Sequence, residues 1–129
     1  MSDTPEENAV LVERRDRVMI ITMNRPEARN AINSALANGV WDAVQELNND
    51  PGLTAGVLTG SAGTFCAGMD LKAFARGEEM GAMGSFIRGG CEKPLIAAIE
   101  GYALAGGCEM ALSCDLLVAA KDSQIGIRE

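Results

Sequence analysis

Histidine is absent from this 129-residue chain, and aromatic residues make up only 4% of it. Without an imidazole, Ser-His-Asp and Cys-His nucleophilic machinery is excluded, so acid–base chemistry falls to Asp, Glu, Lys, Tyr or Cys. Positive charge is also scarce, because 11 lysine and arginine residues face 18 aspartate and glutamate residues, for a net charge of −7. This balance argues against a nucleic-acid binder, which needs a basic face.

Paired cysteine motifs and long apolar runs are missing too. The four cysteines contain no C-x-x-C pair and no histidine completes a zinc site, so we expect buried thiols and no metal. No apolar run reaches the ~18 residues of a membrane helix. The start, MSDTPEEN, lacks the basic and apolar regions of a signal peptide. We therefore expect a cytoplasmic protein without a membrane partner.

Hydrophobic residues make up 47% of the chain, enough for the core of one domain. We expect a disordered tail at 1–8, followed by part of a single domain at 9–129. Apolar, β-branched runs alternate with amphipathic segments, which predicts βαβ units and a mostly parallel sheet. The run VMIITM is nearly continuous, typical of a strand covered on both faces. Strands are expected at 10–12, 18–23, 55–59, 95–99 and 115–120.

Helices are expected from Asn33 or Ser34 to about Leu47, at 70–76 and at 106–114. The first has an apolar stripe at helical spacing and ends at the polar run before Pro51. The segment 77–90 contains five glycines, and we expect it to be mobile.

Two glycine-rich junctions, at 60–71 and 101–109, stand out between expected strands and helices. The first lacks the Lys-Ser/Thr of a Walker A loop, and neither contains Gly-x-Gly-x-x-Gly, so nucleotide motifs are excluded. Glycines let backbone N–H groups approach a ligand closely, and a helix start favours negative charge. Glu109 follows directly in the second junction. The pattern indicates a site where an oxyanion and a proton-transferring carboxylate meet.

Three motifs in collinear order carry a resemblance to a known family. NRPEARNAI at 24–32, FCAGMDL at 65–71 and KPLIAAIEGYALAGGCEMALSCDLLVAA at 93–120 closely resemble the crotonase (enoyl-CoA hydratase/isomerase) family. The resemblance implies a crotonase-like (ClpP/crotonase) α/β spiral of ββα units with a mostly parallel sheet. Domains of that family are longer, so the chain resembles a truncated, N-terminal half. We expect its last strand to leave apolar surface uncovered.

The resemblance also implies a chemistry, the hydration of trans-2-enoyl-CoA thioesters in fatty acid metabolism. Positions matching the family's two backbone oxyanion donors are Met69 and Gly106. Positions matching its two catalytic glutamates are Glu109 and Glu129, one to activate water and one to move the C2 proton. No cofactor is implied beyond the CoA of the substrate.

Substrate contacts are carried over in the same way. Ala67 matches a backbone contact to adenine, and Asp70, Leu71 and Lys72 match the acyl-CoA contact segment. Lys72 and Arg25 are candidate cations for the CoA phosphates. The family further implies a homo-oligomer, a trimer or hexamer, for the full domain.

Other functions stay open on the residues themselves. The family commonly has Gly-x-Pro-Glu where this chain has Gly126-Ile127-Arg128-Glu129, and the Arg128 cation lowers the proton affinity of a neighbouring glutamate. One alternative is therefore isomerisation, or other acyl-CoA enolate chemistry, with one dominant carboxylate. Another is a catalytically inert fragment that serves as a binding or assembly chain.

Overall fold

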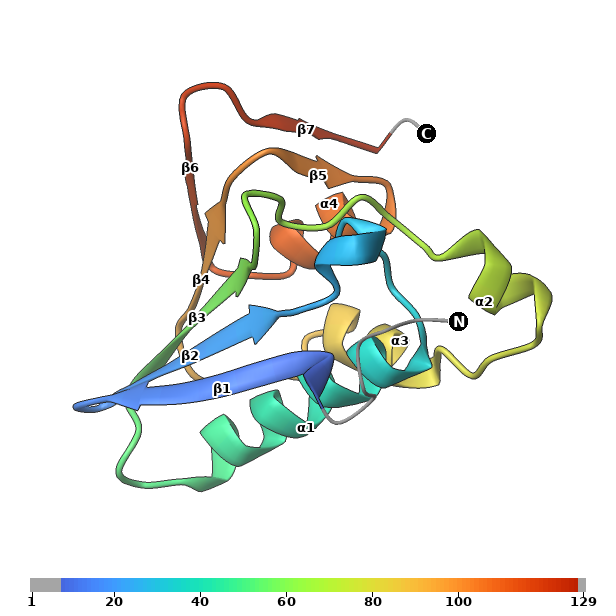
Figure 1. Ribbon diagram of the computed structural model, residues 1–129. Coiled ribbons are helices and arrows are strands. Elements are labelled where there is room, and N and C mark those ends of the chain that lie inside the picture. The colour runs from blue at the N-terminus through green and yellow to red at the C-terminus, as the bar shows by residue number, and fades with distance from the viewer. Residues whose placement is uncertain (1–7, 128–129) are drawn as a thin grey trace.

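A computed structural model describes residues 8–127 and contains a five-stranded sheet with the order β1-β2-β3-β4-β6 (Figure 1). β1 is antiparallel to β2, and every other neighbouring pair is parallel, as the sequence pattern predicts. Glu129 and the predicted tail, apart from Asn8, lie outside the described residues. The strands are β1 (Val10–Arg15), β2 (Val18–Met23), β3 (Ala55–Gly60), β4 (Leu95–Ile99) and β6 (Leu116–Ala119).

The first hairpin differs from the prediction in length. β1 runs to Arg15 instead of ending at Val12, and its last residue pairs with Val18 of β2. Asp16 makes the tight turn with a φ of 55°. The charged residues at 13–15 are exposed, and an edge strand tolerates such side chains because it faces water on one side.

The first helix confirms its predicted stripe. α1 (Ser34–Asn49) starts after Asn33, whose side-chain oxygen accepts a hydrogen bond from the Leu36 N–H at 2.9 Å. The four residues of the stripe are fully buried: Leu36, Val40, Val44 and Leu47. The predicted second helix is observed as α2 (Leu71–Ala75). A 3-10 turn at Pro26–Ala28 lies between β2 and α1.

The glycine-rich segment 77–90 forms a helix, α3 (Gly81–Ile87), where we expected mobile chain. Met83 and Phe86 of α3 are buried in the core cluster beside α1. Asn48 of α1 anchors the end of the segment, donating to the Gly90 carbonyl at 2.7 Å. Packing of apolar side chains therefore outweighs the low helix propensity of glycine.

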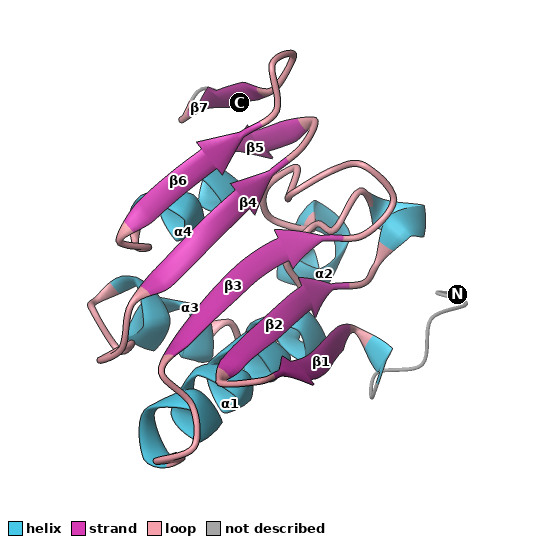
Figure 2. Ribbon diagram, turned by 90° about the vertical axis from the view of Figure 1, so that its left-hand side faces the viewer, coloured by secondary structure: helices cyan, strands magenta, loops and turns pink. Residues whose placement is uncertain are grey.

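All longer helices lie against one face of the sheet (Figure 2). α4 (Gly106–Leu112) lies on the same side of the sheet as α1, and α1 contacts β2. Met19 and Ile21 of β2 are fully buried. Their neighbours Val18 and Ile20 are only half-buried. The expectation that β2 is covered on both faces is therefore wrong for the part of the chain that the structure describes.

A second, two-stranded sheet was not predicted. β5 (Tyr102–Leu104) pairs in parallel with β7 (Gln124–Gly126), and both are three residues long. The surface near β6 and β7 confirms the expected uncovered apolar area, with six large exposed side chains: Leu112, Leu116, Leu117, Val118, Ile125 and Ile127. Among residues 8–127, no helix has both the length and the apolarity to cross a membrane.

Candidate active site

The segment Cys66–Asp70, called the strip below, connects two parts of the fold. On one side, the Cys66 N–H donates to the Tyr102 carbonyl of β5 at 2.8 Å. On the other side, the Ala67 N–H donates to the Arg29 carbonyl at 3.1 Å. The strip is therefore fixed between β5 and the loop 24–32.

Met69 sits on the strip with its backbone groups turned outward. The Ile32 N–H donates to the Gly68 carbonyl at 2.8 Å, and the Asp70 N–H donates to the Ile32 carbonyl at 2.9 Å. In this parallel bridge, Met69 lies between the Gly68 carbonyl and the Asp70 N–H, which both bond to Ile32. The N–H of Met69 itself therefore points away from Ile32. Gly68 makes the turn possible with a φ of 120°, which side chains rarely permit.

The start of α4 lies against the strip. Ala105, which precedes α4, holds a φ of 50° and a ψ of −117°, a strained backbone for a residue with a side chain. Gly107 allows the close approach, since a β-carbon there would clash with the Cys66 carbonyl oxygen. A β-carbon at Gly106 would lie 3.7 Å from Met69 Cγ. The fold thus brings the two predicted donor positions, Met69 and Gly106, side by side.

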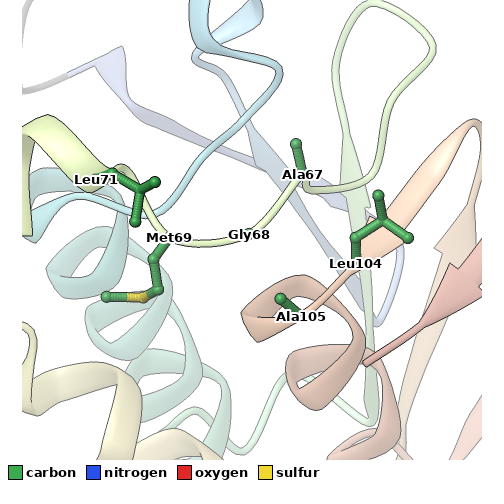
Figure 3. A pocket seen from close by; sticks show the side chains of 6 residues that line it. All are labelled: Ala67, Gly68, Met69, Leu71, Leu104 and Ala105. Atoms are coloured by element: carbon green, nitrogen blue, oxygen red, sulfur yellow. The ribbon is translucent and has the colours of Figure 1, made fainter. Parts of the chain in front are cut away.

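The backbone N–H groups of Met69 and Gly106 both lack a hydrogen-bond partner in the part of the chain that the structure describes. Gly106 is the first residue of α4, and a first-turn N–H has no partner inside its helix. Met69 lines a largely apolar cavity of about 260 Å³ (Figure 3), together with Ala67, Gly68, Leu71, Leu104 and Ala105. Gly106 is buried next to Ala105 and does not itself line this cavity.

Glu109 is on the first turn of α4 and is exposed to solvent. Its backbone N–H donates to the Ala105 carbonyl at 3.0 Å, which ties it to the strained residue before the helix. Its side chain does not line the cavity. Glu129, the predicted second acid, lies outside the described residues, so the pairing of the two carboxylates stays a prediction.

Arg25 and Asp70 are engaged with each other instead of facing solvent. Their side chains form an ion pair at 3.1 Å between Nη2 and Oδ2, and Arg25 is 6% exposed. Asp70 also accepts from the backbone N–H groups of Lys72 and Ala73, both at 3.1 Å, and so caps α2. Burial alone raises the pKa of Asp70, but the Ala73 N–H and the Arg25 guanidinium outweigh it and leave the pKa below the ordinary 3.8.

The other predicted substrate contacts lie at the cavity or next to it. Ala67 and Leu71 line it, and Leu71 is 75% exposed at the start of α2. Lys72 follows on α2 and is exposed, as a phosphate-binding cation would need to be.

Asn30 is a site-supporting residue that the sequence analysis did not single out. It is fully buried, its Oδ1 accepts from the Arg25 N–H at 2.7 Å, and its Nδ2 donates to the Thr64 carbonyl at 2.7 Å. Its φ of 57° is a conformation that asparagine tolerates better than most residues. The sequence feature that could have indicated this role is the position of the asparagine within the turn-forming run NRPEARN.

Three of the four cysteines, Cys66, Cys108 and Cys114, are the buried thiols expected from the sequence, whereas Cys91 is half-buried. Burial raises the pKa of Cys66 to about 11 and that of Cys114 to about 12, so both stay protonated near neutral pH. Across the described range 8–127, no three Cys, Asp or Glu side chains gather in a metal-binding group.

Comparison with known proteins identifies the family. The family model for enoyl-CoA hydratase/isomerase matches residues 13–129. A probable enoyl-CoA hydratase of Mycobacterium bovis is 46% identical over 125 residues, which cover 91% of this chain and 48% of the relative. The 2,3-dehydroadipyl-CoA hydratase of Escherichia coli is 39% identical over 127 residues, covering 93% of this chain and 49% of the relative.

Solved structures agree with this result. An enoyl-CoA hydratase from Mycobacterium tuberculosis superposes with a TM-score of 0.86 at 56% identity, covering 92% of this chain and 48% of that one. The chain thus spans about half the length of the curated relatives it matches. The structure has a crotonase fold with a mostly parallel sheet, and the chain belongs to the enoyl-CoA hydratase/isomerase family.

Proposed function

We propose that this chain provides the thioester-binding part of the active site of an enoyl-CoA hydratase, which adds water to trans-2-enoyl-CoA in fatty acid metabolism. The observation that carries the proposal is the pair of unpartnered N–H groups, at Met69 and Gly106, beside an apolar cavity. The names of the relatives, among them enoyl-CoA and 2,3-dehydroadipyl-CoA hydratases, support the same reaction class.

The reaction places negative charge where these donors are. The water oxygen bonds to C3, the C2–C3 π electrons move through C1, and the thioester oxygen becomes an enolate. The Met69 and Gly106 N–H groups stabilise that oxygen more strongly as it gains charge, and an apolar surrounding strengthens both hydrogen bonds. Removal of one such donor costs about 10²–10³ in rate.

The two proton transfers fall to carboxyl groups. Glu109 takes a proton from the attacking water, and a second carboxyl group gives a proton to C2 as the enolate collapses to the saturated thioester. By the family resemblance, that second group is Glu129. In this scheme protons and electrons balance without a cofactor beyond the CoA of the substrate.

We assign the CoA part of the substrate to the strip and α2. The Ala67 carbonyl accepts from the adenine amino group, because the Ala67 N–H is already bonded to Arg29. Leu71 packs against the apolar part of the ligand, and the exposed Lys72 binds a phosphate. We further propose a cytoplasmic homo-oligomer, a trimer or hexamer, which the size of the protein in solution tests.

The test follows the conjugated enoyl absorbance when a short trans-2-enoyl-CoA is mixed with the protein. Glu109→Gln should slow its loss by about 10²-fold or more, the usual contribution of general acid–base catalysis. Glu100→Gln, a substitution at another exposed glutamate, is the matched control. Equal rates for the two variants would contradict the role of Glu109. Binding of CoA without any turnover would instead support an inert binding chain.

Isomerisation of 3-enoyl-CoA is a second candidate, because a single carboxylate can carry one proton from C2 to C4. Glu109 is the one acid in the first turn of α4. Product analysis with 3-enoyl-CoA separates the reactions: an isomerase yields the conjugated 2-enoyl thioester, whereas a hydratase leaves the substrate unchanged.

A further inference from the structure

The Arg25 guanidinium touches both sides of the bridge between Ile32 and Met69. Its Nη1 donates to the Ala31 carbonyl at 2.6 Å, and its Nη2 pairs with Asp70 at 3.1 Å. Ala31 directly precedes Ile32, and Asp70 directly follows Met69. One rigid group therefore joins the loop 24–32 to the strip at the point where Met69 turns its N–H outward.

Arg25 is itself held in place by the loop. Its backbone N–H donates to Asn30 Oδ1 at 2.7 Å, and its carbonyl accepts from the Ala28 and Asn30 N–H groups at 3.0 and 2.9 Å. Asn30 in turn donates to the Thr64 carbonyl, just before the strip. The loop thus fixes the backbone from which the guanidinium reaches Asp70.

The chemistry of the pair suits positioning better than ligand binding. With 8% and 15% of their side chains exposed, Arg25 and Asp70 are largely removed from water. A buried ion pair adds little net stability compared with apolar packing, whereas its geometry is highly specific. The planar guanidinium fork also reaches two acceptors at once, which a lysine ammonium on a flexible stem does not reproduce.

We infer that Arg25 is a positioning residue that acts through Asp70 and Ala31 to hold the Met69 N–H where the thioester carbonyl binds. This role replaces the CoA-phosphate contact that the sequence resemblance implies for Arg25. The inference rests on the proposed function of Met69. Asp70, the partner of Arg25 in the ion pair, is a positioning residue in the same sense.

The experiment compares Arg25→Gln with Arg88→Gln, a matched loss of charge at an exposed position after α3. Each protein is titrated with CoA and with a conjugated trans-2-enoyl-CoA, whose absorbance moves to longer wavelength when its carbonyl is polarised. For Arg25→Gln we expect CoA affinity to stay at the parent value, the shift of the bound enoyl group to shrink, and kcat to fall about tenfold to hundredfold. Arg88→Gln should match the parent in all three.

The opposite pattern would overturn the inference. If Arg25→Gln weakens CoA binding while the bound enoyl group keeps its full shift, Arg25 binds phosphate after all. Arg25→Lys keeps the positive charge and should restore only part of the absorbance shift of the bound enoyl group. Full restoration of that shift would contradict the need for a guanidinium that reaches two acceptors.

Amide hydrogen exchange separates this inference from the proposed function. If the parent protein binds no acyl-CoA, the proposed function fails, yet the link to the strip can still be measured. Arg25→Gln should speed exchange of the Ile32 and Asp70 amides, which form the bridge around Met69. Unchanged exchange at both amides would refute the positioning role, whatever the activity.

Discussion

Replacing Asn30 with alanine should cost the protein about 4 kcal/mol of unfolding free energy. Asn30 is fully buried and makes three side-chain hydrogen bonds, one from the Arg25 N–H and two to the carbonyls of Ser61 and Thr64. Alanine removes these three hydrogen bonds, at about 1 kcal/mol each. Its β-carbon at a φ of 57° adds about 1 kcal/mol, which asparagine largely avoids.

The measurement is a urea unfolding curve followed by circular dichroism. A domain of this length has a stability of roughly 6–19 kcal/mol, so the loss should move the midpoint far outside error. Asn38→Ala is the control, because Asn38 is exposed on α1 and its side chain makes no hydrogen bond among the described residues. Alanine should be neutral or slightly stabilising there, as a better helix former.

A second variant divides the effect into its two parts. Asn30→Gly loses the same hydrogen bonds but accepts the positive φ, so it should cost about 3 kcal/mol, less than alanine. A loss below about 1 kcal/mol for Asn30→Ala would show that the junction between the loop and the strip does not depend on this side chain.

Three further substitutions test the fold and its surface. Phe86→Ala, in the segment expected to be mobile, should cost about 3–5 kcal/mol in the same unfolding assay, whereas Phe74→Ala, 65% exposed on α2, should stay within about 0.5 kcal/mol. Asp70→Asn should flatten the acid side of the stability–pH curve: the folded pKa lies below 3.8, so its charge stabilises the fold above that value and the contribution is lost as pH falls through the folded pKa. Val118→Lys, in the uncovered apolar area, should reduce self-association in sedimentation velocity more than Leu11→Lys on β1. Equal effects of the two substitutions would argue against self-association through the area around Val118.

Local patterns in the sequence determined the core elements and the family. The helical spacing of Leu36, Val40, Val44 and Leu47 was enough to predict α1, because a buried stripe is a property of one segment. The strands at 18–23, 55–59 and 95–99 were predictable for the same reason, because each segment contains the apolar residues that mark it as a buried strand. The glycine-rich junctions indicated a site for an oxyanion, and the resemblance implied its two donor positions, Met69 and Gly106, and its chemistry.

Only the tertiary structure decided the features that depend on distant partners. α3 forms because α1 buries Phe86, and β5 and β7 exist as strands because they pair with each other. The outward direction of the Met69 N–H comes from its bridge to Ile32, 37 positions earlier in the numbering. Arg25 is a candidate cation for a ligand on sequence alone, because sequence shows a charge but not its burial. Its burial beside Asp70 is what supports the positioning role that we infer. Sequence therefore specified which groups are present, and long-range packing specified which of them line the cavity and which are buried.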